Sequence, residues 1–306
     1  MTRGVTAISH EVYELHTLIL WICIVIGIGV FGMMFISMFK HRKSKGAVAA
    51  NFHDNMTVEV LWTIVPFLIL IAMAVPAAKT LIKMETPADD AEVTVKITGY
   101  QWKWNYDYMH EGFNYFSNLS TDCDEINNKK DKGEHYLLEV DNRMVLTAGK
   151  KVRFLMTSND VIHSWWVPDF AVKKDANPGF INEAWTNVNE PGIYRGQCAE
   201  LCGKDHGFMP VVVIAKTPAD FDEWLQKQEL AAIKAKEEEQ RLLAMNMSME
   251  ELMAQGKKVY DTACVACHQA NGGGLPPMFP ALKGSKIAME KENIPVHIDY
   301  IINGKN

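Results

Sequence analysis

Twelve consecutive residues hold two thiols, an imidazole and a thioether, in the order Cys198-Ala199-Glu200-Leu201-Cys202-Gly203-Lys204-Asp205-His206-Gly207-Phe208-Met209. Sulfur ligands together with imidazole suit copper, zinc or iron–sulfur centres and match hard cations poorly. The thioether favours copper among these metals, because methionine serves mainly as a weak ligand of copper and of haem iron. The stretch therefore predicts a soft-metal loop, around which the rest of the chain is organised.

A second metal signature lies near the C-terminus, in the run Cys264-Val265-Ala266-Cys267-His268. Cys-x-x-Cys-His is the attachment motif of a c-type haem, whose iron the histidine binds. The alternative is a thioredoxin-like redox pair, which needs a βαβ setting that the sequence does not predict. Covalent haem attachment takes place in an oxidising compartment, so this part of the chain is expected outside the cytoplasm.

Composition limits the class of protein. The chain has 306 residues, enough for two or three domains, and its net charge of −6 argues against nucleic acid as a partner. Four of the six cysteines belong to the two motifs, which leaves Cys23 in an apolar run and Cys123 in a polar loop. Ligand or attachment chemistry is therefore favoured over a disulfide framework.

The N-terminal third predicts a transmembrane hairpin over residues 1–90. Residues 18–39 and 60–78 carry no charged side chain, and either run can cross a hydrocarbon core of about 30 Å as a helix. We place the spans at about 18–39 and 60–82. The basic loop that follows the first span is expected in the cytoplasm, which puts both termini outside. A buried hairpin of a soluble protein is the alternative. Residues 1–17 lack a signal-peptide pattern.

From residue 92 the apolar side chains alternate with polar ones, as Val93, Val95 and Ile97 do. This period predicts a half-buried strand. Similar runs, separated by turn-forming residues, cover 135–140, 151–158, 192–197 and 210–216. Many short strands with turn signals predict an antiparallel sandwich or barrel over residues 91–217.

Other segments have their own signatures. Aromatic side chains at strand spacing are expected to share one face, and they are Tyr100, Trp102, Trp104, Tyr106 and Tyr108. Residues 117–134 are polar and predict a surface loop. The charged segment within 218–248 predicts a solvated spacer helix. Residues 249–306 form a third, small unit.

The metal loop needs one more strong ligand from elsewhere. His163, in Asp160-Val161-Ile162-His163-Ser164-Trp165-Trp166, lies at the end of a predicted strand. A histidine on a strand end, with the other ligands on a distant loop before the last strand, is the layout of cupredoxins. Two thiolates can bridge a pair of coppers, each with one histidine and one weak axial donor. A Cys198–Cys202 disulfide is one alternative, and a zinc site is another, although methionine is not a usual zinc ligand.

Over residues 10–225 the sequence resembles subunit II of cytochrome c oxidase. The matching motifs are Glu59-Val60-Leu61-Trp62-Thr63-Ile64-Val65-Pro66, Gln101-Trp102-Lys103-Trp104, His163-Ser164-Trp165 and the metal loop. The resemblance implies an all-β, cupredoxin-like Greek-key domain and a binuclear copper A centre. Its ligands would be His163, Cys198, Cys202, His206, Met209 and the backbone carbonyl of Glu200.

The same resemblance implies roles for three side chains. The carboxylate of Glu200 would bind a magnesium ion shared with subunit I. Trp102 would be the residue through which electrons enter, although Lys103 stands where an aromatic residue is often found. Glu59 would lie at the mouth of a proton-uptake pathway into subunit I, and the alternative is an ordinary interfacial acid.

With the haem motif added, the chain resembles the subunit II–cytochrome c fusion of bacterial caa-type oxidases. Residues 249–306 are then expected to form a small all-α cytochrome c domain that is truncated, without a closing helix. Cys264, Cys267 and His268 would hold the haem. The sixth iron ligand is expected beyond Asn306, and the candidates within the chain are Met278, Met289 and His297.

The predicted function is electron transfer in the bacterial inner membrane, with the copper and haem domains on the periplasmic face. A soluble or membrane cytochrome would donate electrons to haem c, and copper A would pass them to haem a of subunit I. Subunit I, which also carries copper B, would reduce oxygen to water and pump protons, and subunit III is a further expected partner. The rivals are a copper A subunit of a nitric oxide reductase and a membrane-anchored copper carrier. The haem motif counts against the carrier.

Overall fold

The computed structural model describes residues 2–48, 51, 53–244, 247–274 and 279–303. The chain divides into two compact units, Met1–Lys234 and Ala235–Asn306. The first contains an N-terminal helical hairpin, a β-sandwich and the beginning of a long helix, and the second is helical. These three kinds of structure are those that the sequence predicts.

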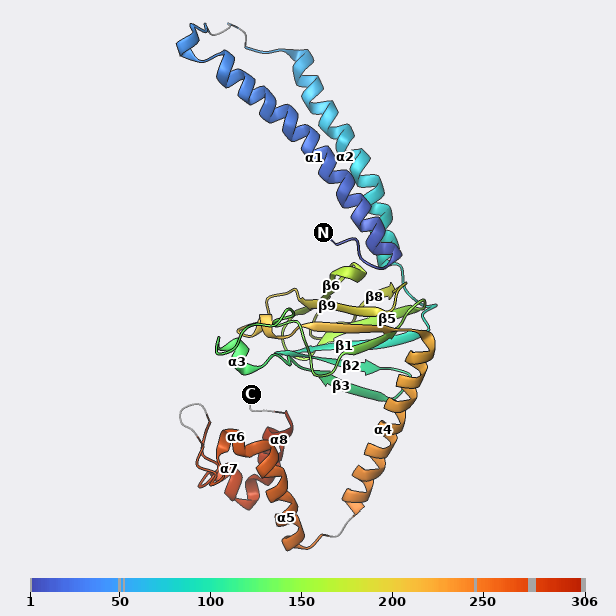
Figure 1. Cartoon of the computed structure of the whole chain (residues 1–306), viewed down its shortest axis with the longest axis vertical. Helices are drawn as coiled ribbons and strands as arrows, with labels where there is room; N and C mark the ends of the chain where they lie inside the picture. Colours follow the sequence, from blue (N-terminus) through green and yellow to red (C-terminus); the bar gives the residue numbers. More distant parts are fainter. Residues whose placement is uncertain (1, 49–50, 52, 245–246, 275–278, 304–306) are drawn as a thin grey trace. The chain divides into compact units, whose positions relative to one another are not determined.

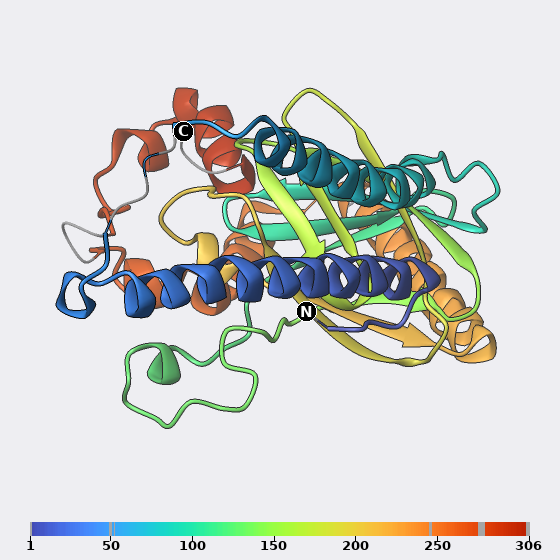
Figure 2. The same ribbon diagram turned by 90° about the horizontal axis from the view of Figure 1, so that it is seen from above.

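The hairpin consists of α1 (Ala7–Lys40) and α2 (Met56–Glu85), which run side by side (Figures 1 and 2). Both helices are long and apolar enough to cross a membrane, by length and composition. Between them lies one turn of 3₁₀-helix, η1 (Lys43–Lys45), in the basic connection. Both helices extend beyond the predicted spans of 18–39 and 60–82, and their outer ends reach the sandwich.

Backbone and side-chain contacts fasten the hairpin to the sandwich. The N–H of Val5 donates to the carbonyl of Asp169 at 2.9 Å, in the 3₁₀ turn η2 (Pro168–Phe170). Lys174 of the sandwich binds the carboxylate of Glu85, at the end of α2, at 2.7 Å. The two helices are therefore anchored at the end opposite their connection.

Two five-stranded sheets make the sandwich. The first has the order β3-β2-β1-β5-β8, and its strands are β1 (Val93–Tyr100), β2 (Lys103–Tyr108), β3 (Phe113–Ser117), β5 (Lys151–Ser158) and β8 (Asn182–Asn187). The second has the order β4-β10-β9-β6-β7, and its strands are β4 (Met144–Thr147), β6 (His163–Val167), β7 (Val172–Ala176), β9 (Gly192–Cys198) and β10 (Val211–Lys216).

Strand directions differ in one respect from the antiparallel arrangement that the sequence predicts. β1 pairs with β5 in parallel, and β10 pairs with β4 in parallel, whereas the other pairs are antiparallel. Parallel pairing is possible because long connections separate the strands of both pairs along the chain. Alternate residues of β5, such as Phe154 and Met156, are fully buried between the sheets.

Two further expectations about the strands are wrong. Residues 135–140 form turns and one isolated bridge at Val140, because the consecutive bulky residues Tyr136, Leu137 and Leu138 do not alternate as a strand requires. The five aromatic residues also do not share one face, because the chain turns between β1 and β2. Tyr100 pairs with Lys103, the neighbour of Trp104, so Tyr100 and Trp104 lie on opposite faces of the sheet. This turn separates Tyr100 and Trp102 from the fully buried aromatic residues of β2.

The long helix α4 (Pro218–Ala244) is not simply a solvated spacer. Within the first unit, Phe221 retains only 3% of its accessible surface, and the Trp224 ring lies 5.3 Å from the ring of Tyr108. These aromatic side chains are three residues apart, so they share the helix face that covers the sandwich. The overall composition of the helix does not predict this buried face, because most of its residues are charged or small.

After the end of α4, the regular elements in the described residues of the second unit are all helical. They are α5 (Met249–Val259), the π-helical turn η4 (Tyr260–Cys264), α6 (Val265–His268), α7 (Lys286–Met289), the 3₁₀ turn η5 (Lys291–Asn293) and α8 (Ile294–Asn303). Ser248 and Glu251 form a capping box at the start of α5. α8 lies where no closing helix was expected.

Candidate metal centre

Strand pairing brings the distant histidine to the metal loop. β6, which begins at His163, pairs with β9, which ends at Cys198, and Trp165 lies opposite Cys198 in the ladder. The chain then forms the loop before β10, with a 3₁₀ turn, η3 (His206–Phe208). The start of β6 and the end of β9 therefore lie side by side at one end of the sheet, where they meet the loop.

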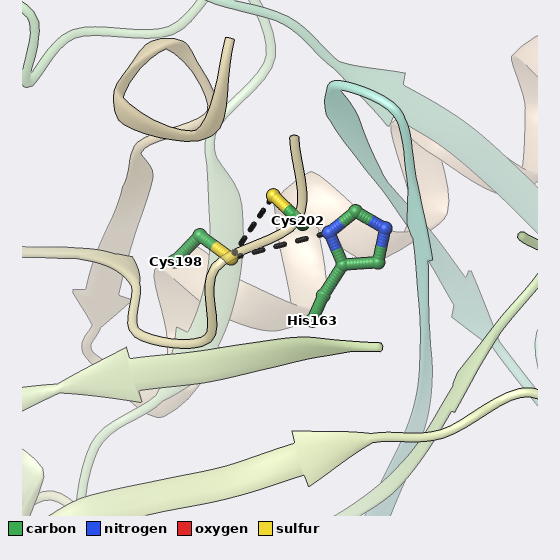
Figure 3. Close-up of side chains that lie close together, drawn as sticks. All are labelled: His163, Cys198 and Cys202. Carbon is green, nitrogen blue, oxygen red and sulfur yellow. Dashed lines mark hydrogen bonds between the residues drawn. The ribbon is translucent and has the colours of Figure 1, made fainter. Parts of the chain in front are cut away.

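The core of the centre is a buried group of one imidazole and two thiols (Figure 3). The Cys198 and Cys202 sulfurs lie 3.8 Å apart, and Nδ1 of His163 lies 3.9 Å from the Cys198 sulfur. The three ligand atoms lie within 4.8 Å of one another. All three residues are buried, so a bound ion would be shielded from water.

The remaining donors surround this pair of sulfurs. Nδ1 of His206 and Sδ of Met209 lie 3.4 Å and 3.6 Å from the Cys202 sulfur. The carbonyl oxygen of Glu200 lies 3.3 Å from the Cys198 sulfur. All six expected donors therefore converge, with two sulfurs in the middle and imidazole, thioether and carbonyl groups around them. This donor set fits copper, because it combines thiolates, imidazoles and weak axial donors.

The two thiols differ in acidity. Burial raises the pKa of the Cys198 thiol, but the hydrogen bonds with His163 and with the backbone outweigh it and lower this pKa to about 7. Burial and the neighbouring Cys198 charge raise the pKa of Cys202 to about 12. Without metal, therefore, the Cys198 thiol titrates near neutral pH whereas the Cys202 thiol stays protonated. A bound cation is needed to keep both as thiolates.

Three neighbours fix the His163 ring. Its Nε2 donates to Oδ1 of Asp160 at 2.8 Å, which leaves Nδ1 directed at the sulfurs. The ring of Trp104 packs edge-on against the imidazole, with centroids 5.8 Å apart. On another side lies Gly99, where an added Cβ would approach Cδ2 of His163 to 2.7 Å. The imidazole is thus oriented before any metal binds.

The residues that support the centre are harder to locate from the sequence than the donors. A carboxylate three residues before a candidate ligand histidine, as in Asp160 and His163, is a usable signal. The motif around Gln101 gives no sign that its side-chain amide donates to the Cys202 carbonyl, as it does at 2.9 Å. The role of Gly99 depends on how β1 packs on β6, which the local sequence does not reveal.

Trp102 and Glu200 lie at the centre, whereas Glu59 does not. The half-buried indole of Trp102 donates from Nε1 to the Cys202 carbonyl at 3.1 Å. Glu200 is exposed overall. Glu59 lies in the first turn of α2, about seven helical turns from the end of α2 that contacts the sandwich.

In the second unit, the Cys-x-x-Cys-His motif lies on η4 and α6. Cys264 and Cys267 are half-buried, and Nδ1 of His268 donates to the Pro280 carbonyl at 3.0 Å. This bond fixes the tautomer and leaves Nε2 free to bind iron, so the residues present fit a haem. Of the candidate sixth ligands, Met278 lies outside the described residues and Met289 is 69% exposed. His297 lies on α8.

Two membrane-length helices, a sandwich with a buried soft-metal centre and a helical unit with a haem motif define a membrane-anchored, cupredoxin-like metalloprotein. The chain belongs to the cytochrome c oxidase subunit II family. The family models for the transmembrane domain and the periplasmic domain of this subunit match residues 1–80 and 93–216, and a cytochrome c model matches residues 253–303.

Relatives share most of the chain. The "Probable cytochrome c oxidase subunit 2" of Rickettsia bellii is 40% identical over 227 residues, which are 74% of this chain and 82% of the relative. Cytochrome c oxidase subunit 2 of Arabidopsis thaliana is 36% identical over 224 residues, covering 73% and 86% of the two chains. The crystal structure of the periplasmic domain of subunit II from Bradyrhizobium japonicum is 37% identical, covers 46% of this chain and 96% of that one, and has a TM-score of 0.41.

Family membership establishes the general role of the chain. It is a membrane protein and a subunit of an oxidoreductase complex, in which it associates with other oxidase subunits. The periplasmic domain of the family implies a copper A centre, and the cytochrome c domain implies haem.

Proposed function

We propose that His163, Cys198, Cys202, His206, Met209 and the carbonyl of Glu200 hold a binuclear copper A centre. The observation that carries this proposal is the convergence of all six donors on one pair of sulfurs, 3.8 Å apart. A bound copper pair supplies a one-electron relay whose charge is shared over two metals. The strand ends and the Asp160 carboxylate hold the ligands in one geometry for both oxidation states.

Trp102 is the residue through which electrons enter this centre. Its indole is partly exposed, so a donor can touch it, and its Nε1 is hydrogen-bonded to the carbonyl of the ligand residue Cys202. A side chain that reaches from the surface to a ligand provides a short route for electrons. Lys204, whose Nζ lies 6.0 Å from the indole ring centre, flanks this surface.

Cys264 and Cys267 attach a haem c, and His268 binds its iron. The bond from Nδ1 of His268 to the Pro280 carbonyl supports this assignment, because it orients the imidazole and raises its basicity as a ligand. When bound, the haem supplies a second one-electron site, placed before copper A in the electron path.

The chain works as subunit II of a terminal oxidase in the bacterial inner membrane, with both metal units on the periplasmic side. It receives electrons from a soluble or membrane cytochrome and passes them to haem a of subunit I, which with copper B reduces oxygen to water and pumps protons. Subunit III completes the assembly. The Glu200 side chain binds magnesium at the subunit I interface, and Glu59, at the opposite end of α2, takes part in proton uptake.

Co-purification tests this proposal. The complex isolated through this chain should consume oxygen when a reduced cytochrome is added, and Cys198→Ser should abolish that activity while the complex still assembles. Consumption of nitric oxide instead of oxygen would assign the chain to a nitric oxide reductase. A complex without any large haem-containing subunit would contradict the proposal.

A further inference from the structure

We propose that Gln101 is the positioning residue that sets the alignment of Trp102 with the copper ligands. The inference rests on the proposed function, since it takes Trp102 as the residue through which electrons enter and Cys202 as a ligand. Gln101 lies in the turn between β1 and β2, directly before Trp102, and it is exposed. Although Gln101 is exposed, its hydrogen bonds are made to residues of the metal centre.

Gln101 is hydrogen-bonded to the segment that carries His163 and to the loop that carries Cys202. Its backbone N–H donates to Oδ2 of Asp160 at 2.7 Å, and Oδ1 of the same carboxylate accepts from Nε2 of the ligand His163 at 2.8 Å. Its side-chain Nε2 donates to the carbonyl of Cys202 at 2.9 Å. One residue of the turn is therefore linked to the strand that carries His163 and to the loop that carries Cys202.

Trp102 shares one of these acceptors. Its Nε1 donates to the Cys202 carbonyl at 3.1 Å, so the amide of Gln101 and the indole bind the same oxygen. A carbonyl oxygen has two lone pairs and can accept both bonds. Because the two donors come from adjacent residues, the Gln101 bond holds the turn close to the ligand loop. It thereby limits the positions that the indole can take.

The ligand loop leaves room for this arrangement at Gly203. This glycine has a φ of +117°, and an added Cβ would lie 3.1 Å from Nε2 of Gln101 and 3.1 Å from Cζ2 of Trp102. A side chain at this position would crowd both donors. The close approach of the turn to the loop therefore depends on glycine at position 203 as well as on the hydrogen bonds of Gln101.

The proposal makes electron entry sensitive to a residue that is not itself on the electron path. Without the amide bond, the turn can move away from the loop, and the fraction of molecules with an aligned indole falls. Loss of one hydrogen bond changes such a population by about fivefold to tenfold. A residue that only helps the donor dock would instead change the KM for the donor and leave the first-order rate at saturating donor unchanged.

The test uses the assembled, metal-loaded complex with Gln101→Glu and Gln101→Met. Both side chains have nearly the length of glutamine and lack the amide donor, and Met carries no charge. Gln197→Ala is the control, because it changes an exposed glutamine next to the ligand Cys198. We expect both Gln101 variants to keep the wild-type copper content and to reduce copper A about fivefold to tenfold more slowly at saturating donor. The control should match the wild type.

A second readout does not depend on activity. In the copper-free protein, the indole N–H of Trp102 should exchange with solvent faster in both Gln101 variants than in the wild type or in Gln197→Ala. Unchanged exchange, a change in KM alone, or a slower rate in Gln101→Glu but not in Gln101→Met would overturn the proposal. If the wild-type chain itself binds no copper pair, the proposed function fails instead, so the two failures are distinguishable.

Discussion

At the residue scale, the residues that pack around His163 support the metal centre. Gly99 lies against the His163 ring, and Asp160 and Trp104 hold that ring on two other sides. The six proposed ligands could be selected from the sequence, because soft-metal donors in a short loop are rare and the motif that they match is specific. Their supports could not be predicted, because contacts between β1 and β6 depend on sheet packing rather than on neighbouring residues in sequence.

Gly99→Ala should damage the copper site. The new methyl group would lie 2.7 Å from Cδ2 of His163, so the imidazole or β1 must move. We expect copper binding to fall sharply and the sandwich to lose about 1–3 kcal/mol of unfolding free energy, as overpacked cores do. Copper analysis and urea unfolding of the detergent-solubilised chain would measure both effects.

Gly207→Ala is the matched control for this substitution. It places the same methyl group in the metal loop, between His206 and Phe208, but an added Cβ there meets nothing within 4 Å. Its copper content should remain at the wild-type level. If Gly99→Ala also retained full copper content and an unchanged absorption spectrum, the role assigned to Gly99 would be wrong.

At the element scale, periodicity located β1, β5, β9 and β10, but it failed at residues 135–140 and where the chain turns between β1 and β2. The alternation in β5 matches its predicted span, because each second side chain enters the core. The aromatic residues keep their spacing across the tight turn at Trp102, so spacing alone predicted one shared face for side chains that belong to two strands and the turn between them. The composition of α4 did not predict its aromatic face. Most residues of the helix are charged or small, and the aromatic residues that pack on the sandwich lie only near its beginning.

Trp224→Ala should loosen α4 from the sandwich. The indole packs on Tyr108 and Phe113, with ring centroids 5.3 Å and 5.8 Å away. We expect a loss of about 2 kcal/mol of unfolding free energy, less than for a fully buried tryptophan because Trp224 is only half-buried. Leu230→Ala, on an exposed side chain of the same helix, should cost no more than about 0.5 kcal/mol. Equal losses in urea unfolding would show that this face does not hold the helix.

At the scale of the whole molecule, the chain combines a membrane anchor, a metal-binding sandwich and a separate helical unit. The order of these parts could be predicted, because hydropathy, alternation and motif spacing change distinctly along the sequence. The attachment of the hairpin to the sandwich through Val5 and Asp169 could not, since it joins segments far apart in the chain. Because the copper donors and the haem motif lie in separate compact units, we predict that loss of the haem leaves the copper centre in place.

Replacing both Cys264 and Cys267 with serine should test that independence. Serine forms no thioether with a haem, so haem staining on a denaturing gel should disappear. The copper absorption should persist, because the copper ligands all belong to the other unit. Persistence of the haem stain would refute attachment at this motif, and simultaneous loss of copper from a folded chain would refute the independence of the two units.

The number of copper ions per chain tests the central claim most directly. The purified chain, loaded with copper and freed of loosely bound metal, should contain two copper ions and give the electron paramagnetic resonance signal of one electron shared between them. Cys202→Ser should abolish the shared signal, because it removes one of the two sulfurs that lie 3.8 Å apart. One copper ion per chain or none, or a signal from a single isolated copper, would contradict a binuclear centre.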